Sequence, residues 1–253
     1  MISDSKPLPA APPSAAARAE LAPHGKLRLA FPVASALYVT KDPATGALKG
    51  LSLDLGEALA ARLGVPFEPL PCPSVRDLLA ATGADRWDIA TIIMEAEREK
   101  TFDYSKPYLE ADSTYLVPAG SAIHTVAEAD KSGTRIGVAE NSAFDNFLSR
   151  EIKHATLVRY PGVGAAFEGL RANESDAVAA PRQVLAAAQG KFPESRILDD
   201  WFDLARVGVV VPKGRQAIGL AYVNAFLSEA ISLGWMAQAI ERAGVKGAKV
   251  PFG

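Results

Sequence analysis

The sequence has one cysteine, Cys72, and only three histidines, His24, His124 and His154. A single cysteine excludes an intramolecular disulfide and a cysteine-rich zinc site. The three histidines are far apart in the chain, and neither a His-Glu-x-x-His pattern nor a Gly-Lys-Ser/Thr phosphate loop occurs. The sequence therefore gives little support to a metal site, and we expect no cofactor.

The chain also has little net charge and no long apolar run. Its 27 lysines and arginines nearly balance 29 acidic residues, for a formal charge of -2, which offers no footprint for nucleic acid or an anionic membrane. The longest apolar runs, such as RVGVVVP and AAPRQVLAAA, are far shorter than the ~18 residues of a membrane-spanning helix. We expect no nucleic-acid partner and no membrane span.

The first 25 residues lack the basic-then-apolar order of a secretion signal. They are rich in proline, alanine and serine, and we interpret 1–25 as a polar lead-in. Two locations remain open on this evidence. The protein is periplasmic if a leader was removed, and cytoplasmic if it is made without one.

Two series of alternating strand and helix patterns follow the lead-in. Leu51, Leu55, Leu59 and Leu63 recur four apart and predict a helix that ends at Gly64. The predicted strands are 26–31, 65–70, 87–93, 134–139, 155–161, 176–180 and 205–212. The other predicted helices are 74–83, 141–152, 163–175, 181–190, 215–232 and 234–244. This alternation predicts an α/β fold in which helices flank mainly parallel sheets.

The segment 98–118, REKTFDYSKPYLEADSTYLVP, has neither a strand period nor a helix period. It begins charged, becomes aromatic, breaks at Pro107 and ends apolar, as expected of a strand that crosses from one lobe to the next. Because ligands favour domain interfaces and the carboxyl ends of parallel strands, we expect a ligand cleft between two lobes.

Three motifs in order carry a resemblance to a known family: GLSLDLGEALAARLG at 50–64, REKTFDYSKPY at 98–108 and SDAVAA at 175–180. Between about Lys26 and Gly244 the chain resembles the family 3 extracytoplasmic solute-binding proteins, which feed ABC importers for polar amino acids and related solutes. The resemblance implies a two-lobe periplasmic-binding-protein type II fold. Lobe 1 would comprise 26–115 and 206–253, and lobe 2 would comprise 116–205. It also implies a non-enzymatic monomer whose partners are a small carboxylate ligand and an ABC transporter permease.

The resemblance assigns ligand-binding roles to Arg98, Tyr38, Asn141 and Ser142. Arg98 matches the arginine that grips the ligand carboxylate at two points, a role suited to a planar guanidinium, and its alternative is a surface pair with a glutamate of its own turn. Tyr38 stands near an aromatic that stacks on the ligand, and its alternative is core packing. Asn141 and Ser142 correspond to an anion-binding turn, and their alternative is plain helix capping.

The sequence departs from the family pattern at the positions that hold a ligand ammonium. Pro32 and Pro181 stand where members that bind α-amino acids usually have acids. An ammonium ion without a carboxylate partner costs several kcal/mol to desolvate, so these prolines argue against an α-amino acid ligand. Arg182 adds positive charge beside the second gap. We expect a small organic anion or an amino-acid-like carboxylate, bound by Arg98 and Arg182 among others.

Two other functions remain open. Periplasmic cyclohexadienyl dehydratases resemble these binding proteins, and a dehydratase would need a proton donor, for which Glu140 and Asp145 are the nearby acids. A leaderless cytoplasmic ligand sensor is the other alternative. We expect a binding protein rather than an enzyme.

Overall fold

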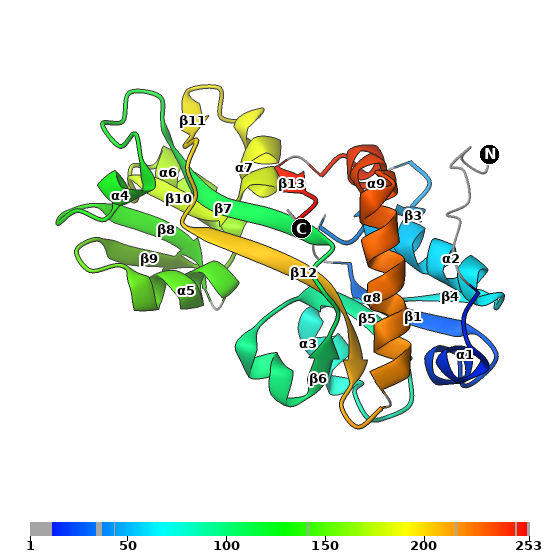
Figure 1. The fold of residues 1–253 in the computed structure, drawn as a ribbon. Helices are drawn as coiled ribbons and strands as arrows, with labels where there is room; N and C mark the ends of the chain where they lie inside the picture. The colour runs from blue at the N-terminus through cyan, green and yellow to red at the C-terminus, as the bar shows by residue number, and fades with distance from the viewer. Residues whose placement is uncertain are drawn as a thin grey trace. The chain divides into compact units, whose positions relative to one another are not determined.

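The computed structural model describes residues 12–33, 37–42, 44–140, 142–215, 217–245 and 247–251. The chain forms two compact α/β units, and it leaves the first unit and later returns to it (Figure 1). Unit 1 comprises Met1–Glu110 and Arg206–Gly253, and unit 2 comprises Ala111–Ala205. The sequence analysis set the first boundary after residue 115, and the structure sets it after Glu110, within the strand that leaves unit 1.

Unit 1 is built on a mainly parallel sheet. Its strands are β1 (Leu27–Pro32), β2 (Thr40–Lys41), β3 (Leu48–Lys49), β4 (Phe67–Cys72), β5 (Ile89–Ile93), β6 (Phe102–Tyr104), β13 (Ala248–Lys249), the start of β7 (Leu109–Pro118) and the end of β12 (Asp203–Pro212). Strand β1 lies between β4 and β5 and is parallel to both, whereas β12 is antiparallel to β5. Strands β2 and β3 form a separate antiparallel pair.

Unit 1 contains the four predicted helices, 51–64, 74–83, 215–232 and 234–244, and two helices that the sequence analysis did not predict, α1 and η1. They are α1 (Ala15–Leu21), α2 (Leu51–Leu63), α3 (Val75–Ala80), the 3-10 helix η1 (Ala96–Lys100), α8 (Ala217–Ser232) and α9 (Trp235–Ala243). The four leucines of α2 are all buried, and Gly64 ends the helix at φ 66°, a left-handed conformation that costs glycine little. The predicted helix 51–64 is confirmed.

Helix α1 corrects the expectation of a polar lead-in up to residue 25. Ser14 caps it, because its hydroxyl accepts the N–H of Ala17 at 3.1 Å, and alanine favours the helix that follows. Leu21 is buried, and a Glu20 carboxylate oxygen accepts the N–H of Gly219 in the first turn of α8 at 2.7 Å. The helix therefore packs on α8 as part of unit 1.

Unit 2 also has a mainly parallel sheet, in the order β7-β10-β8-β9. Its elements are α4 (Val126–Ala129), β8 (Arg135–Ala139), α5 (Ala143–Glu151), β9 (Thr156–Tyr160), α6 (Val163–Arg171), β10 (Ala177–Pro181), α7 (Arg182–Gln189) and β11 (Ser195–Ile197). Strand β8 is parallel to both β9 and β10, and β7 is antiparallel to β10. Alternate residues of β7 and β10 pack toward α4 and α5 on one face and toward α6 and α7 on the other.

The two units repeat one arginine–aspartate ion-pair geometry, near the beginning of β1 in unit 1 and of β8 in unit 2. In unit 1, Arg28 of β1 donates from its backbone N–H and Nε to Asp88 Oδ2 at 3.0 and 3.1 Å, and from Nη2 to Oδ1 at 2.8 Å. In unit 2, Arg135 of β8 makes the same three contacts with Asp176, at 2.8, 3.1 and 2.8 Å. Strands β1 and β5 of unit 1 thus correspond to β8 and β10 of unit 2.

Within the part of the chain that is described, no single helix is long and apolar enough to cross a membrane. Helices α8 and α9 meet that test only as a pair, by length and composition, and they are bent by 81° relative to each other.

Candidate functional site

The carboxyl ends of β1 and β5 lie at one edge of the unit 1 sheet, because the two strands are adjacent and parallel. The segment after β1 carries Tyr38, and the segment after β5 carries Glu95 and Arg98. Such an edge is where α/β sheets usually bind ligands. Tyr38 and Arg98, predicted from the sequence as ligand residues, therefore come from neighbouring segments of one sheet edge.

Arg98 lies in the 3-10 helix η1, which is separated from the end of β5 by Met94 and Glu95. Its Nη1 donates to the backbone oxygen of Ile93 at 3.0 Å, and its Nη2 lies 2.9 Å from Glu95 Oε1. The side chain is 18% exposed. The pairing with Glu95 is the alternative that the sequence left open. The contacts with Ile93 and Glu95 use different terminal nitrogens, so other N–H groups of the guanidinium can still donate to a second anion.

Tyr38 is buried, with 2% of its surface exposed. Its hydroxyl accepts the backbone N–H of Ile93 at 3.1 Å, while Tyr104 donates to the Ile93 oxygen at 3.3 Å. Burial raises the pKa of the Tyr38 hydroxyl above its ordinary value, and the Ile93 N–H opposes this effect. The geometry favours core packing for Tyr38. Its hydroxyl is bonded to the N–H of Ile93, and the backbone oxygen of Ile93 accepts a hydrogen bond from Arg98.

The corresponding edge of unit 2 is formed by β8 and β10, after which α5 and α7 begin. Ser142 is the N-cap of α5, and its hydroxyl accepts the N–H of Asp145 at 3.1 Å. The capping alternative therefore describes the Ser142 side chain. Asn141, the other predicted residue of this turn, lies outside the described residues.

Arg182 makes several hydrogen bonds within unit 2 that the sequence does not predict. Its Nε donates to Asp112 Oδ2 at 2.7 Å, and Nη1 donates to the Leu198 oxygen at 2.8 Å. Nη2 donates to the oxygens of Asp199 and Asp200 at 3.0 and 3.2 Å. All three nitrogens bond to other parts of unit 2, and these contacts favour a structural role for Arg182 over the expected anion-binding role.

Gln183, the next residue, was missed by the sequence reasoning. It is only 7% exposed, and within the described part of the chain neither Oε1 nor Nε2 of its side chain has a hydrogen-bond partner. Its sequence signal is weak. Gln183 lies in the first turn of α7, two residues after Pro181.

The acids considered for a dehydratase lie near the start of α5. Asp145 is 4% exposed and accepts Nε of Arg159 at 3.1 Å and the hydroxyl of Ser149 at 3.3 Å. Arg159 and Ser149 therefore already engage the Asp145 carboxylate. Glu140 is exposed.

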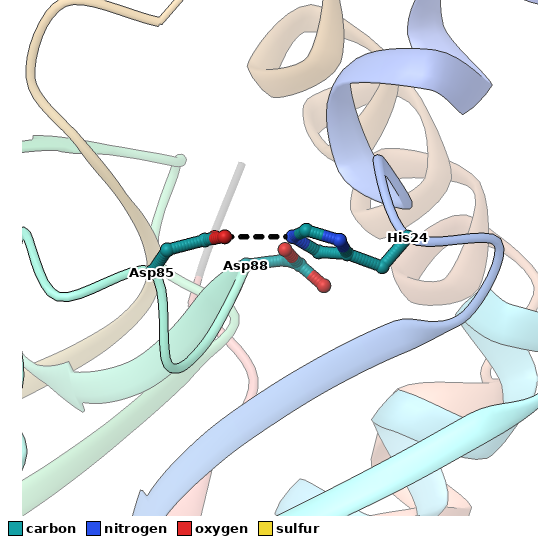
Figure 2. Close-up of side chains that lie close together, drawn as sticks. All are labelled: His24, Asp85 and Asp88. Atoms are coloured by element: carbon teal, nitrogen blue, oxygen red, sulfur yellow. Dashed lines mark hydrogen bonds and ion pairs between the residues drawn. The ribbon is translucent and has the colours of Figure 1, made fainter.

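One group of three side chains in the described residues has metal-ligand types in proximity. His24, Asp85 and Asp88 each offer an atom within 4.8 Å of the others, and His24 Nε2 lies 2.9 Å from Asp85 Oδ2 (Figure 2). Arg28, however, bonds both oxygens of Asp88 and also Asp85 Oδ1, at 2.8 Å. A cation here would lie beside a guanidinium, so we interpret the group as an ion-pair network.

Comparison with known proteins matches most of the chain to one family. Residues 27–244 match the sequence profile of the bacterial extracellular solute-binding proteins, family 3. The ABC transporter glutamine-binding protein GlnH of Bacillus subtilis is 23% identical over 198 residues, covering 76% of this chain and 71% of that protein. The L-cystine-binding protein TcyJ of Escherichia coli is 24% identical over 187 residues, covering 73% and 70%.

Solved structures share the fold. The putative binding component of an ABC transporter from Wolinella succinogenes, complexed with lysine, has a TM-score of 0.73 at 20% identity, covering 87% of this chain and 95% of that one. The ancestral amino acid-binding protein AncCDT-1, described as a precursor of cyclohexadienyl dehydratase, has a TM-score of 0.70 at 24% identity, covering 89% and 98%. The two-lobe type II fold expected from the sequence is confirmed.

Proposed function

Because this chain belongs to the bacterial extracellular solute-binding proteins of family 3, we propose that it binds a small solute through a carboxylate held by Arg98. One observation carries this proposal. Arg98 is partly exposed at the carboxyl edge of the unit 1 sheet and is oriented by a bond to the Ile93 oxygen, which is itself held by Tyr104. A pre-oriented guanidinium pairs with a carboxylate at two points at little further entropic cost.

The solute we propose is not a standard α-amino acid. Pro32 ends β1 and Pro181 ends β10, so neither position offers a carboxylate to an ammonium group. Glu95 is the acid next to Arg98, and its carboxylate already pairs with that arginine. The named relatives are a glutamine-binding protein and an L-cystine-binding protein. Our proposal for this chain differs because, by the resemblance, Pro32 and Pro181 stand where members that bind α-amino acids usually have acids.

The remaining parts of the proposal follow from the family. We propose an extracytoplasmic binding protein that delivers its solute to an ABC transporter permease and acts as a monomer. A catalytic role has less support, because Asp145 is paired with Arg159. Turnover of prephenate or arogenate that is lost in Glu140→Gln would contradict a purely binding role.

A thermal-shift screen tests the ligand class. Small carboxylates with and without an amine are compared, and a ligand present at 100 times its Kd should add ~2.7 kcal/mol to the free energy of unfolding. We expect carboxylates without an α-ammonium group to raise the melting temperature. If only α-amino acids raise it, the interpretation of Pro32 and Pro181 is wrong.

A further inference from the structure

A hollow of about 560 Å³ lies between α6 and α7, entirely within unit 2. One face of α6 and one face of α7, with the turn after it, line the hollow: Gly164, Phe167 and Arg171, and Val184, Ala187 and Lys191. Each set has the spacing i, i+3 and i+7 of a single helix face. Small-molecule sites typically have volumes of about 300–1,000 Å³. We call this hollow the α6–α7 groove.

The α6–α7 groove has aromatic and aliphatic walls. The rings of Phe167 and Phe192 both line it, and their centroids are 5.7 Å apart. Phe167 is 7% exposed, whereas Phe192 and Val184 are only partly buried. Removing such apolar surface from water is favourable, and aromatic rings gain further from contact with one another. The walls therefore suit a ligand with an aromatic ring.

Gly164 keeps the α6 side of the groove open. A Cβ atom at Gly164 would meet no other atom within 4 Å, whereas a Cβ atom at Gly169 of the same helix would clash with the ring of Tyr160. Packing thus explains the glycine at 169 but not the one at 164. Glycine also favours a helix less than alanine does. A bound group that occupies the space beside Gly164 would explain its presence.

One end of the groove is positively charged. The Arg171 guanidinium carbon lies 5.8 Å from the centre of the Phe192 ring, and Lys191 directly precedes Phe192 in the chain. Arg171 pairs with Glu168 at 3.3 Å, and both side chains are largely exposed. Lys191 forms no ion pair with any residue that the structure describes. Two cations therefore face one acid at this end, and an anion would complement the excess charge.

Helix capping does not account for all of these features. Cations are favoured at helix C-termini, where they offset the helix dipole, and this explains why Arg171 and Lys191 stand where α6 and α7 end. It explains neither the apolar hollow beside them nor the open space at Gly164. Those two features indicate a ligand, and the cations indicate its charge.

The dimensions of the groove favour a small molecule over a protein partner. Gly164 and Arg171 are seven residues apart on α6, which corresponds to ~10 Å along the helix. A stable protein partner covers about 800 Å² of each surface, which is much more than a groove of this length offers. An aromatic ring joined to an anionic group by a short chain matches the groove better.

We propose that the α6–α7 groove binds a small aromatic carboxylate, with its ring against Phe192 and Val184 and its carboxylate at Lys191 and Arg171. This is a second ligand site that lies within unit 2. It goes beyond the proposed function and does not depend on it, because the solute carboxylate proposed above binds Arg98 of unit 1.

The experiment is an NMR titration of the full chain with four matched probes. 3-Phenylpropanoate has the ring and the carboxylate, 3-phenylpropanamide has a neutral end, 3-phenylpropylamine has an ammonium end, and propanoate has no ring. The backbone amide signals of Ala187 and Phe192 report on the groove, and that of Glu95 reports on the edge of the unit 1 sheet. We expect 3-phenylpropanoate to shift the Ala187 and Phe192 signals at the lowest concentration of the four probes.

Three variants test the contacts. Lys191→Glu reverses a charge in the groove, and Lys153→Glu is the matched control, because Lys153 is an exposed lysine of unit 2 that does not line the groove. Lys191→Glu should weaken 3-phenylpropanoate by at least about fivefold and strengthen 3-phenylpropylamine, whereas Lys153→Glu should change both by less than about twofold. Ala187→Leu fills the groove from an exposed helix position and should weaken both probes.

Four results would overturn the second site. They are groove signals that do not respond to 3-phenylpropanoate, an equal response to the ammonium probe in the wild type, equal effects of Lys191→Glu and Lys153→Glu, and unchanged binding in Ala187→Leu. A groove that binds an acidic, leucine-containing peptide but not 3-phenylpropanoate would be a protein-docking surface, and the small-ligand site would again be overturned.

Arg98→Ala separates this inference from the proposed function. The second site predicts that the Ala187 and Phe192 signals respond to 3-phenylpropanoate in Arg98→Ala as they do in the wild type. If they no longer respond, the second site is overturned. The proposed function concerns the Glu95 signal instead, since a carboxylate that binds Arg98 should shift that signal in the wild type and not in Arg98→Ala.

Discussion

Arg98 and Glu95 form an ion pair one helical turn apart, with Nη2 of the arginine 2.9 Å from Oε1 of the glutamate. Both side chains are partly exposed, at 18% and 39%. The arginine proposed to hold the solute thus has a carboxylate beside it within the protein. A solute carboxylate must either share the guanidinium with Glu95 or displace it.

Replacing Glu95 by glutamine tests which charge the solute brings to this pair. If the solute is an anion, Glu95→Gln should strengthen binding up to about fivefold, because an exposed pair is worth ~0.2–1 kcal/mol and the competing charge is gone. Calorimetric titration measures the change. Weaker binding would indicate that Glu95 holds a positive group of the solute, which would contradict the proposed ligand class.

The repeated arginine–aspartate geometry predicts unequal stability effects in the two units. Asp88 is fully buried, whereas Asp176 is about one-third exposed. Arg28→Ala leaves a buried carboxylate without its main partner and should cost roughly 3 kcal/mol of unfolding free energy, whereas Arg135→Ala should cost about 1 kcal/mol. Urea unfolding of both variants checks this order, and equal losses would show that burial does not decide the cost.

Acid should destabilise the protein partly through Asp176. Hydrogen bonding to the Arg135 side chain lowers the pKa of this carboxyl below its ordinary value. A lowered folded-state pKa stabilises the protein above the unfolded-state pKa of about 4, and that stabilisation is lost as pH falls through the folded-state pKa. Asp176→Asn should therefore show a shallower fall in melting temperature below about pH 4. An unchanged acid profile would contradict the assignment.

Arg182→Ala should destabilise the protein without a specific effect on binding. It removes the partner of Asp112, whose side chain is 14% exposed, and the donors to three backbone oxygens. We expect a loss of roughly 3 kcal/mol in unfolding free energy and, at a temperature where the variant is folded, carboxylate affinity within about threefold of the wild type. A variant that is stable but no longer binds would restore the ligand role expected from the sequence.

Local patterns were enough to predict most of the fold. The leucines of α2 and the stop at Gly64 interact within one segment, so their spacing reveals the helix. Helix α1 was missed because it follows a proline-rich stretch and is stabilised by α8, which is distant in sequence. The ion pair of Arg28 with Asp88 was missed for the same reason.

The candidate site was less predictable, because side-chain partners decide it. Arg182 looked like an anion site, but Asp112 and residues 198–200, which hold it, are distant in sequence. Tyr38 was expected to stack on the ligand, with core packing as the alternative, and its burial and its bond to Ile93 depend on how β1 and β5 pair. Gln183 has no motif at all, and only its burial draws attention to it.

The most direct test of the account is a calorimetric titration of wild type, Arg98→Ala and Lys100→Ala with the best carboxylate from the screen. Lys100 is the control, because it pairs with Glu97 in the same 3-10 helix but is largely exposed. The account predicts that Arg98→Ala weakens binding by roughly 2–5 kcal/mol, that it costs only about 1 kcal/mol of unfolding free energy, and that Lys100→Ala binds as the wild type does. Full-affinity binding by Arg98→Ala, or an equal loss in both variants, would contradict the claim that Arg98 holds the solute carboxylate.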